Sequence, residues 1–224
     1  MSHITENVGR ILATVPDGVL VVAAIKGRSA DEVREVVDAG IHFLGANYVS
    51  DGRLARQAAG QRAECHFIGR LRPHDVRPGT LSLFDMVQSV ASHDIAARID
   101  ARSAVLGRIT PVLIEVNSGR EPQKDGVLPE DVPAFIDAVS GMEHLAVRGL
   151  MTMGPLSDNP DDYRPCFAET RRLFESMSAI SHPRLTMRYL SMGMSASYRV
   201  AIDEGANMVR LGTILFEKQS SRQG

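Results

Sequence analysis

Eight short, apolar, β-rich runs alternate along the chain with longer stretches whose apolar residues have helical spacing. The runs span residues 19–26, 42–47, 65–69, 86–90, 111–117, 147–153, 189–193 and 208–215. Several are apolar on both faces, which is typical of parallel strands covered by helices. In a chain of 224 residues, this alternation predicts an α/β fold, a single (β/α)8 TIM barrel that forms one domain over residues 1–224. A doubly wound open sheet is the alternative.

Helical spacing between the runs predicts the covering layer. Helices are expected at residues 30–39, 51–61, 93–106, 131–142, 163–180 and 195–204, and an extra N-terminal helix at 4–15. The connection at 72–80 contains Pro73, Pro78 and Gly79, so any helix there is predicted to be short or irregular. Residues 221–224 are predicted to form a frayed tail.

Composition excludes several classes of protein. The net charge is −2 and there is no Trp, so neither a basic surface nor stacking aromatics indicate binding to nucleic acid. No run of eighteen apolar residues is present, so no membrane span is expected. The two cysteines, Cys65 and Cys166, exclude a disulfide framework, and we expect no metal site. The N-terminus lacks the apolar region of a signal peptide, so the predicted location is cytoplasmic.

Lys26 ends the first run after seven uncharged residues. Active sites of TIM barrels lie at the carboxyl ends of the strands, which places this lysine at the barrel mouth. Partial desolvation there would lower the pKa of the amine and make it a nucleophile toward an aldehyde, with which it forms a Schiff base. The alternative is a solvated lysine without function.

Two segments near the C-terminus predict a phosphate site. Residues 191–195 read Ser-Met-Gly-Met-Ser and lead into a predicted helix, which Ser195 is expected to cap. Gly212 and Thr213 follow the eighth run. Because the loops after strands seven and eight of barrels frequently bind phosphate, the two segments support each other.

Three further polar residues lie in or after the runs. Arg210, in a strand interior, needs a partner, either a ring nitrogen of a cofactor or a barrel carboxylate such as Glu115. Asn47 and Asn117 are each either hydrogen-bonding partners of a ring substituent or strand-end turn residues. His66 is expected to be a hydrogen-bonded core histidine rather than a metal ligand.

Seven strings of residues, in this order, resemble the pyridoxal-phosphate homeostasis family, and the resemblance covers nearly all of the chain. They are Ala-Ile-Lys-Gly-Arg (24–28), Leu-Gly-Ala-Asn-Tyr (44–48), His-Phe-Ile-Gly (66–69), Glu-Val-Asn (115–117, followed by Lys124 and Gly126), Arg-Gly-Leu-Met (148–151), Leu-Ser-Met-Gly-Met-Ser (190–195) and Met-Val-Arg-Leu-Gly-Thr (208–213). The last two strings are the most specific.

The resemblance implies a fold and a set of site residues. The fold is that of the N-terminal barrel of alanine racemase, fold type III among pyridoxal-phosphate proteins. Lys26 would form the Schiff base with pyridoxal 5′-phosphate, Arg210 would face the pyridine nitrogen, and Asn47 the polar edge of the ring. The implied phosphate ligands are Ser191, Gly193, Ser195, Gly212 and Thr213.

The chain departs from the family pattern at three places. Ala46 replaces a glutamate, Arg28 replaces a second lysine, and residues 72–75 replace a Gln-Ser-Asn-Lys stretch. We expect these departures to alter a secondary cofactor site or a partner surface more than the main cofactor pocket.

Three functions remain open at this stage. The first is a carrier or regulator of intracellular pyridoxal phosphate, which is expected to catalyse no dedicated reaction. Its expected partners are the small-molecule cofactor and PLP-dependent apo-enzymes. A small PLP-dependent enzyme such as an amino-acid racemase is the second hypothesis. It is disfavoured because the chain ends about ten residues after the eighth run, without the β-domain that supplies a second base, and because an arginine at the ring nitrogen weakens the ring as an electron sink. A barrel that binds sugar phosphates without a Schiff base is the third.

Overall fold

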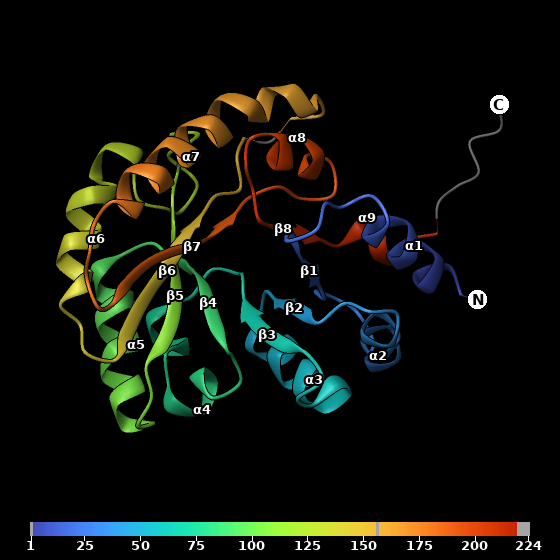
Figure 1. Ribbon diagram of the computed structural model, residues 1–224. Helices are drawn as coiled ribbons and strands as arrows, with labels where there is room; N and C mark the ends of the chain where they lie inside the picture. The colour runs from blue at the N-terminus through green and yellow to red at the C-terminus, as the bar shows by residue number, and fades with distance from the viewer. Residues whose placement is uncertain (1, 156, 219–224) are drawn as a thin grey trace.

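Eight parallel strands close into a barrel in the order of the sequence, as Figure 1 shows. The computed structural model describes residues 2–155 and 157–218. The strands are β1 (Leu20–Ala24), β2 (Phe43–Ala46), β3 (Glu64–Phe67), β4 (Met86–Val90), β5 (Thr110–Glu115), β6 (Leu145–Met151), β7 (Leu185–Ser191) and β8 (Met208–Leu211). Each predicted run overlaps one strand. The ladder between β1 and β8, from Leu20 opposite Met208 to Ala23 opposite Leu211, closes the barrel, so the TIM barrel is confirmed and the open sheet is wrong.

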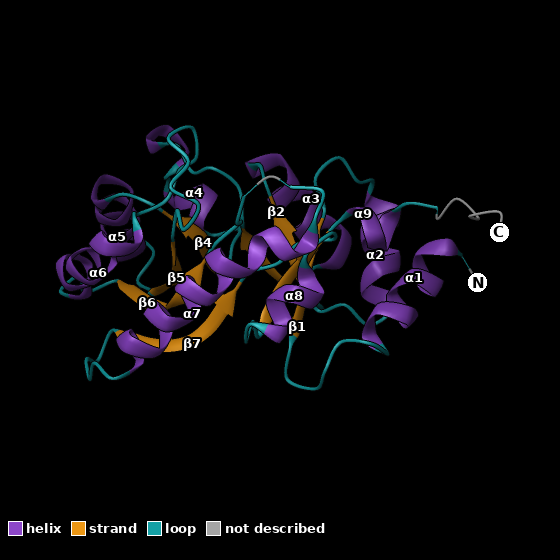
Figure 2. Ribbon diagram, turned by 90° about the horizontal axis from the view of Figure 1, so that it is seen from above, coloured by secondary structure: helices purple, strands orange, loops and turns teal. Residues whose placement is uncertain are grey.

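Helices surround the strands on the outside of the barrel, which Figure 2 shows from above. The α-helices are α1 (His3–Leu12), α2 (Ala30–Asp38), α3 (Val49–Ala59), α4 (Pro78–Leu81), α5 (His93–Val105), α6 (Val132–Ser140), α7 (Arg164–Ser178), α8 (Tyr198–Asp203) and α9 (Thr213–Phe216), and the short 3-10 helices are η1 (Pro73–Asp75), η2 (Pro129–Asp131) and η3 (Pro160–Tyr163). The connection after β3 contains only η1 and α4, so its predicted irregularity is confirmed. Within 2–155 and 157–218 we find no helix with the length and apolar character of a membrane span.

The extra N-terminal helix is confirmed as α1, which lies beside α9 in Figure 1. Its apolar side chains Ile4, Val8 and Ile11 are buried in the core. Asn7 donates hydrogen bonds to the carbonyl oxygens of Leu215 and Glu217, at 3.1 and 3.0 Å. The first helix therefore holds the segment that follows the last strand. The predicted tail, 221–224, lies outside the described residues.

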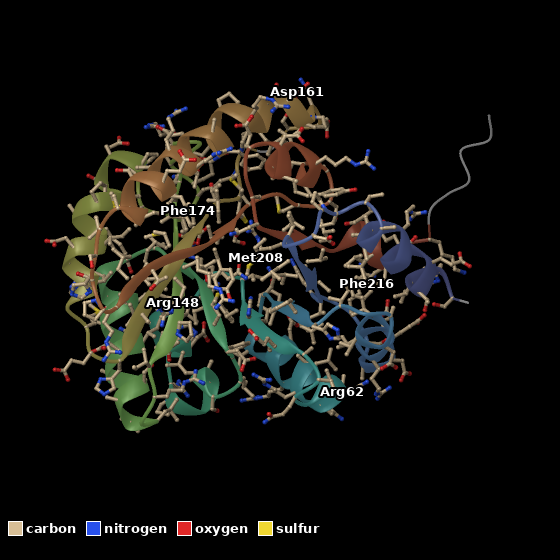
Figure 3. All side chains as sticks on the ribbon, in the orientation of Figure 1. Arg62, Arg148, Asp161, Phe174, Met208 and Phe216 are labelled. Atoms are coloured by element: carbon tan, nitrogen blue, oxygen red, sulfur yellow. The ribbon has the colours of Figure 1, made fainter. Side chains whose placement is uncertain are left out.

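Two apolar clusters lie on opposite faces of the strands. Val112, Ile114 and Leu150 belong to the large cluster between the strands and the helices. Leu113 and Met151, their neighbours in sequence, belong to a small cluster with Met86 and Tyr189. Because successive side chains of a strand face opposite sides, the small cluster fills the barrel interior. Met208, labelled in Figure 3, lies near the centre of the molecule.

Two predicted elements differ from the observed ones near the C-terminus. The strand expected at 208–215 ends at Leu211, and Thr213–Phe216 forms the single-turn helix α9. The helix expected at 195–204 is shorter, because α8 begins at Tyr198 and its N-cap is Ser197, not Ser195. The hydroxyl of Ser197 accepts a hydrogen bond from the N–H of Met194 at 3.2 Å, which tightens the turn before the helix.

Candidate functional site at the carboxyl end of the barrel

Lys26 lies two residues beyond the end of β1, at the barrel mouth. The ladder continues past the strand, because the N–H of Ile25 donates to the carbonyl oxygen of Gly45 at 2.9 Å. Continued alternation places Lys26 on the same face as Val22, which pairs with Arg210. Its side chain is exposed, so the predicted desolvation is wrong. Its Nζ lies 5.6 Å from the ring centroid of Tyr48, a cation–π contact at the ends of β1 and β2.

The two predicted phosphate segments meet in the structure. The N–H groups of Gly212 and Ile214 both point at Ser195 Oγ, at 3.3 and 3.5 Å. Gly193 has φ +91°, and a side chain there would bring a Cβ within 2.5 Å of the Cβ of Ala201, so the turn requires glycine. Thr213 is exposed at the start of α9. Backbone donors and hydroxyls thus converge beside the end of β8.

The end of β1 lies beside these backbone donors and hydroxyls. A Cβ at Gly212 would lie 3.5 Å from the Cβ of Ala24, an ordinary contact. Gly212 therefore lies directly beside the strand that carries Lys26 to the mouth.

Ser191 does not belong to this group of donors. Its side chain is fully buried inside the barrel. Its hydroxyl donates to Gln88 Oε1 at 2.7 Å and accepts from Arg210 Nη1 at 2.7 Å. The expected contact between Ser191 and a phosphate is therefore wrong, because both hydrogen-bonding roles of the hydroxyl are taken inside the barrel.

Arg210 is buried with only 4% of its surface exposed. Its Nη1 donates to the carbonyl oxygen of Ser191 as well as to the hydroxyl, and its Nη2 donates to the carbonyl oxygen of Thr152 at 2.9 Å. Burial lowers the pKa of Arg210 to about 10, and the charge of Glu115 partly opposes that effect. The guanidinium therefore stays charged at neutral pH.

Glu115 is the barrel carboxylate that we considered as a partner for Arg210. No ion pair joins the two side chains in the described part of the chain, where Arg210 bonds carbonyl and hydroxyl oxygens instead. Burial raises the pKa of Glu115 to about 7. Its carboxyl group lines a cavity of about 260 Å³ at the barrel mouth, together with Asn47, Lys124 and Thr152.

The two asparagines both line the cavity but differ in their contacts. The carbonyl oxygen of Asn47 lies so close to Gly69 that a Cβ there would approach it to 2.1 Å. Asn117 bridges its own loop, since its amide donates to the carbonyl oxygen of Glu121 at 3.0 Å and accepts from the N–H of the same residue. Asn117 is thus the strand-end turn residue of the two alternatives.

The side chains at two of the departures from the family pattern contact the outer layer of the barrel. Ala46 is fully buried in the outer apolar cluster, so the replaced glutamate removes no polar group from the barrel interior. The guanidinium of Arg28 lies over the ring of Phe216, 4.7 Å from its centroid, and 3.6 Å from Glu32. Arg28 therefore contacts α9 and α2.

Three residues that take part in the hydrogen bonds of the candidate site were not predicted from the sequence. Gln88 is fully buried inside the barrel and bonds both His66 and Ser191. The sequence signal for Gln88 was a single amide residue after two apolar residues in the run Met-Val-Gln-Ser-Val. Thr152 and Ile214 contribute through backbone atoms, which no side-chain pattern reveals. His66 is confirmed as a hydrogen-bonded core histidine, 1% exposed.

The fold and the site together define a class. A closed (β/α)8 barrel carries one lysine at the end of β1, a set of converging N–H groups and hydroxyls after β7 and β8, and a buried arginine in β8. These features define a TIM-barrel protein whose polar groups gather at the carboxyl ends of its strands.

The chain belongs to the family described as alanine racemase, N-terminal domain, whose sequence profile matches residues 1–219. Among curated relatives, the pyridoxal phosphate homeostasis protein of Pseudomonas aeruginosa is 34% identical over 229 residues, covering 96% of each chain. The protein of the same name from Aquifex aeolicus is 34% identical over 196 residues, which are 87% of this chain and 85% of the relative.

A solved structure is similar over nearly the same span. PipY of Synechococcus elongatus, in its structure with pyridoxal phosphate bound, superposes with a TM-score of 0.86 at 28% sequence identity. The match covers 96% of this chain and 100% of PipY.

Proposed function

We propose that this protein binds pyridoxal 5′-phosphate through a Schiff base to Lys26 and thereby carries or regulates the intracellular supply of the cofactor. The observation that carries the proposal is the convergence of Ser195, Gly212 and Ile214 beside the end of the strand that leads to Lys26. Relatives named for pyridoxal phosphate homeostasis and the cofactor-bound structure of PipY support it.

Lys26 is the best candidate among very few amines. The chain has three lysines, Lys26, Lys124 and Lys218. Lys124 Nζ is engaged with Glu121 Oε1 at 2.5 Å and with the carbonyl oxygen of Gly154 at 2.8 Å. Lys218 follows α9 near the C-terminus. Of these three lysines, all within the described residues, Lys26 alone lies at the end of a barrel strand beside the proposed phosphate donors.

The residues present fit the cofactor. Two N–H groups converge on one oxygen position, where Ser195 Oγ lies, and this is the arrangement that an anionic phosphate oxygen needs. We propose that Gly193, Ser195, Gly212 and Thr213 hold the phosphate. Both Nη atoms of Arg210 are bonded within the described chain, which leaves its Nε–H and one hydrogen on Nη2 as donors, and we propose that Nε–H faces the ring nitrogen. Asn47 would contact the polar edge of the ring.

Bound pyridoxal phosphate supplies an aldehyde that exchanges reversibly between amines. Lys26 would hold the cofactor through its Nζ at this aldehyde, in a reversible bond whose formation releases one water molecule. Because the bond hydrolyses or exchanges readily, such a site suits storage and delivery to PLP-dependent apo-enzymes, which we propose as partners. The two free cysteines are in keeping with a reducing, cytoplasmic location.

The decisive experiment is spectroscopic. The purified protein mixed with pyridoxal phosphate should be yellow, and borohydride should fix the cofactor on the peptide that contains Lys26. A protein that stays colourless but binds phosphorylated sugars would support a sugar-phosphate-binding barrel instead.

We expect racemisation and transamination of common amino acids to be negligible. A charged Arg210 would donate a hydrogen bond to the ring nitrogen and leave it unprotonated, so the ring would be a weak electron sink. Amino-acid turnover by the cofactor-loaded protein, followed by chiral chromatography, should stay far below about 1 per second. A rate of that order would favour the hypothesis of a small racemase.

Replacement of Thr213 by Val tests one donor of the phosphate site. The substitution preserves shape and removes the hydroxyl, and a lost hydrogen bond to a charged group corresponds to about 1.5–3 kcal/mol. We expect cofactor affinity to fall roughly tenfold or more, while the visible band at saturating cofactor is unchanged. The matched control is Thr186→Val, an exposed threonine at the start of β7. Equal loss in both variants would remove Thr213 from the site.

A further inference from the structure

A chain of hydrogen bonds crosses the barrel interior and ends at Arg210. His66 Nδ1 lies 2.9 Å from Gln88 Nε2, Ser191 Oγ lies 2.7 Å from Gln88 Oε1, and Arg210 Nη1 lies 2.7 Å from Ser191 Oγ. The four side chains come from β3, β4, β7 and β8 and are between 0% and 4% exposed. The chain therefore connects four strands without contact with bulk water.

The donor and acceptor in each hydrogen bond of this chain can be assigned in order, starting from Arg210. A guanidinium only donates, so Ser191 Oγ accepts from Arg210 and gives its own hydrogen to Gln88 Oε1. The amide nitrogen of Gln88 then faces His66 Nδ1, which must be the acceptor. The ring proton of neutral His66 therefore belongs on Nε2, which lies 3.3 Å from Glu64 Oε2. Reversal of the Gln88 amide would place its donors against the hydroxyl hydrogen of Ser191.

The burial of this amide is costly unless it serves another group. The remainder of the inner cluster is apolar, formed by Met86, Leu113 and Met151. A methionine at residue 88 would match that cluster in size and apolar character. A buried amide contributes no more stability than this methionine when its hydrogen bonds only offset the cost of its own burial. Gln88 is fully bonded, which also includes a contact of 3.2 Å from its Nε2 to Met208 Sδ.

We propose that Gln88, held by His66, is a positioning residue that sets the orientation of Arg210 toward the ring nitrogen of the cofactor; this inference rests on the proposed function. The guanidinium is planar, so hydrogen bonds to both Nη atoms determine the direction of its Nε–H. Ser191 holds Nη1 and the carbonyl oxygen of Thr152 holds Nη2. Without Gln88, the hydroxyl of Ser191 rotates freely, and Nη1 has one fixed acceptor, the carbonyl oxygen of Ser191 at 3.0 Å, in place of two.

The test is the variant Gln88→Met in the full-length protein, with Ser103→Ala as a matched control. Ser103 is also fully buried, and its hydroxyl bonds that of Thr110 at 2.6 Å, outside the chain that leads to Arg210. The probe is pyridoxine 5′-phosphate, which has no aldehyde, so that its affinity in calorimetry reports the ring and phosphate contacts alone. We expect roughly tenfold weaker binding by Gln88→Met and wild-type binding by Ser103→Ala, with both variants folded by circular dichroism.

A double-mutant cycle separates positioning from general packing. In the background of Arg210→Lys, the further change Gln88→Met should weaken binding by less than about twofold, because Gln88 acts only through the guanidinium. An equal loss in both backgrounds would overturn the inference. Should Gln88→Met fail to fold, Ser191→Ala breaks the same chain with a smaller change and carries the same two expectations.

The ligand-free protein supplies an independent readout. In 15N-labelled wild-type protein, neutral His66 should be the Nε2–H tautomer, and Gln88→Met should lose that preference. A Nδ1–H tautomer in the wild type would overturn the inference. Wild-type protein that binds neither pyridoxal phosphate nor pyridoxine 5′-phosphate would reject the proposed function and this inference together, whereas normal wild-type binding with unchanged affinity in Gln88→Met would reject this inference alone.

Discussion

Lys26→Ala should abolish the visible band of the cofactor-bound protein and leave the barrel folded. Its amine is exposed at the end of β1 and contacts one exposed tyrosine ring, so the side chain contributes little to the core. Among the residues that the structure describes, Lys26 has the one side-chain amine at the mouth that is not bonded elsewhere, so its deletion should remove the proposed partner of the aldehyde. Absorption spectra with added pyridoxal phosphate measure the effect, and circular dichroism verifies the fold.

The small number of lysines makes the controls sharp. Lys124→Arg and Lys218→Arg preserve charge and remove the other two side-chain amines, so both should retain the band. Lys26→Arg should lose it, because a guanidinium does not form the Schiff base under these conditions. A Lys26→Ala variant with the wild-type band would show that Lys26 is the wrong lysine.

Removal of the phosphate from the ligand should weaken binding by at least about 3 kcal/mol, which is roughly 100-fold in the dissociation constant. A cofactor phosphate is mostly dianionic near neutral pH and requires donors. The donors proposed here are the N–H groups of Gly212 and Ile214 and the hydroxyls of Ser195 and Thr213. Because α8 begins only at Tyr198 and α9 has a single turn, we assign the effect to these individual donors and not, as expected from the sequence, to a helix N-terminus.

Titration of pyridoxal phosphate and pyridoxal into the ligand-free protein measures this effect. Pyridoxal cyclises through its free hydroxymethyl group, which lowers its aldehyde concentration. The pair pyridoxine 5′-phosphate and pyridoxine, which lack the aldehyde, is therefore the control for the phosphate alone. Equal affinities within each pair would mean that the segments after β7 and β8 hold no phosphate.

The fold was predictable from the sequence because strand and helix periodicities are local. All eight runs overlap strands, β4 with the same bounds, and α2 begins at Ala30 as predicted, directly after the capping box at Ser29. The ends of the last elements were less predictable. Residues 212–215 have the apolar content of a strand, but β8 has already reached the barrel rim at Leu211, where the chain turns toward the contact with α1.

The candidate site was predictable only as a set of strand ends. Position along a strand places Lys26, Asn47, Ser195 and Gly212 at the mouth, because all parallel strands end on the same side. It does not distinguish Ser191 from Ser195, although both belong to one string of six residues. The first points into the barrel and the second lies beyond the strand, where Gly193 has turned the backbone.

Sequence alone determined the eight-fold alternation, the residue types at the mouth and the presence of one arginine in the last strand, since these depend on neighbours within a few positions. The tertiary structure decided which polar groups meet. Ser191 and Gln88 are 103 residues apart, and their contact depends on the register of β4 and β7 across the barrel. Closure of the sheet brings β1 against β8, and only that pairing places Gly212 beside the strand of Lys26. Register and closure are set by the packing of the whole barrel, so no local pattern carries them.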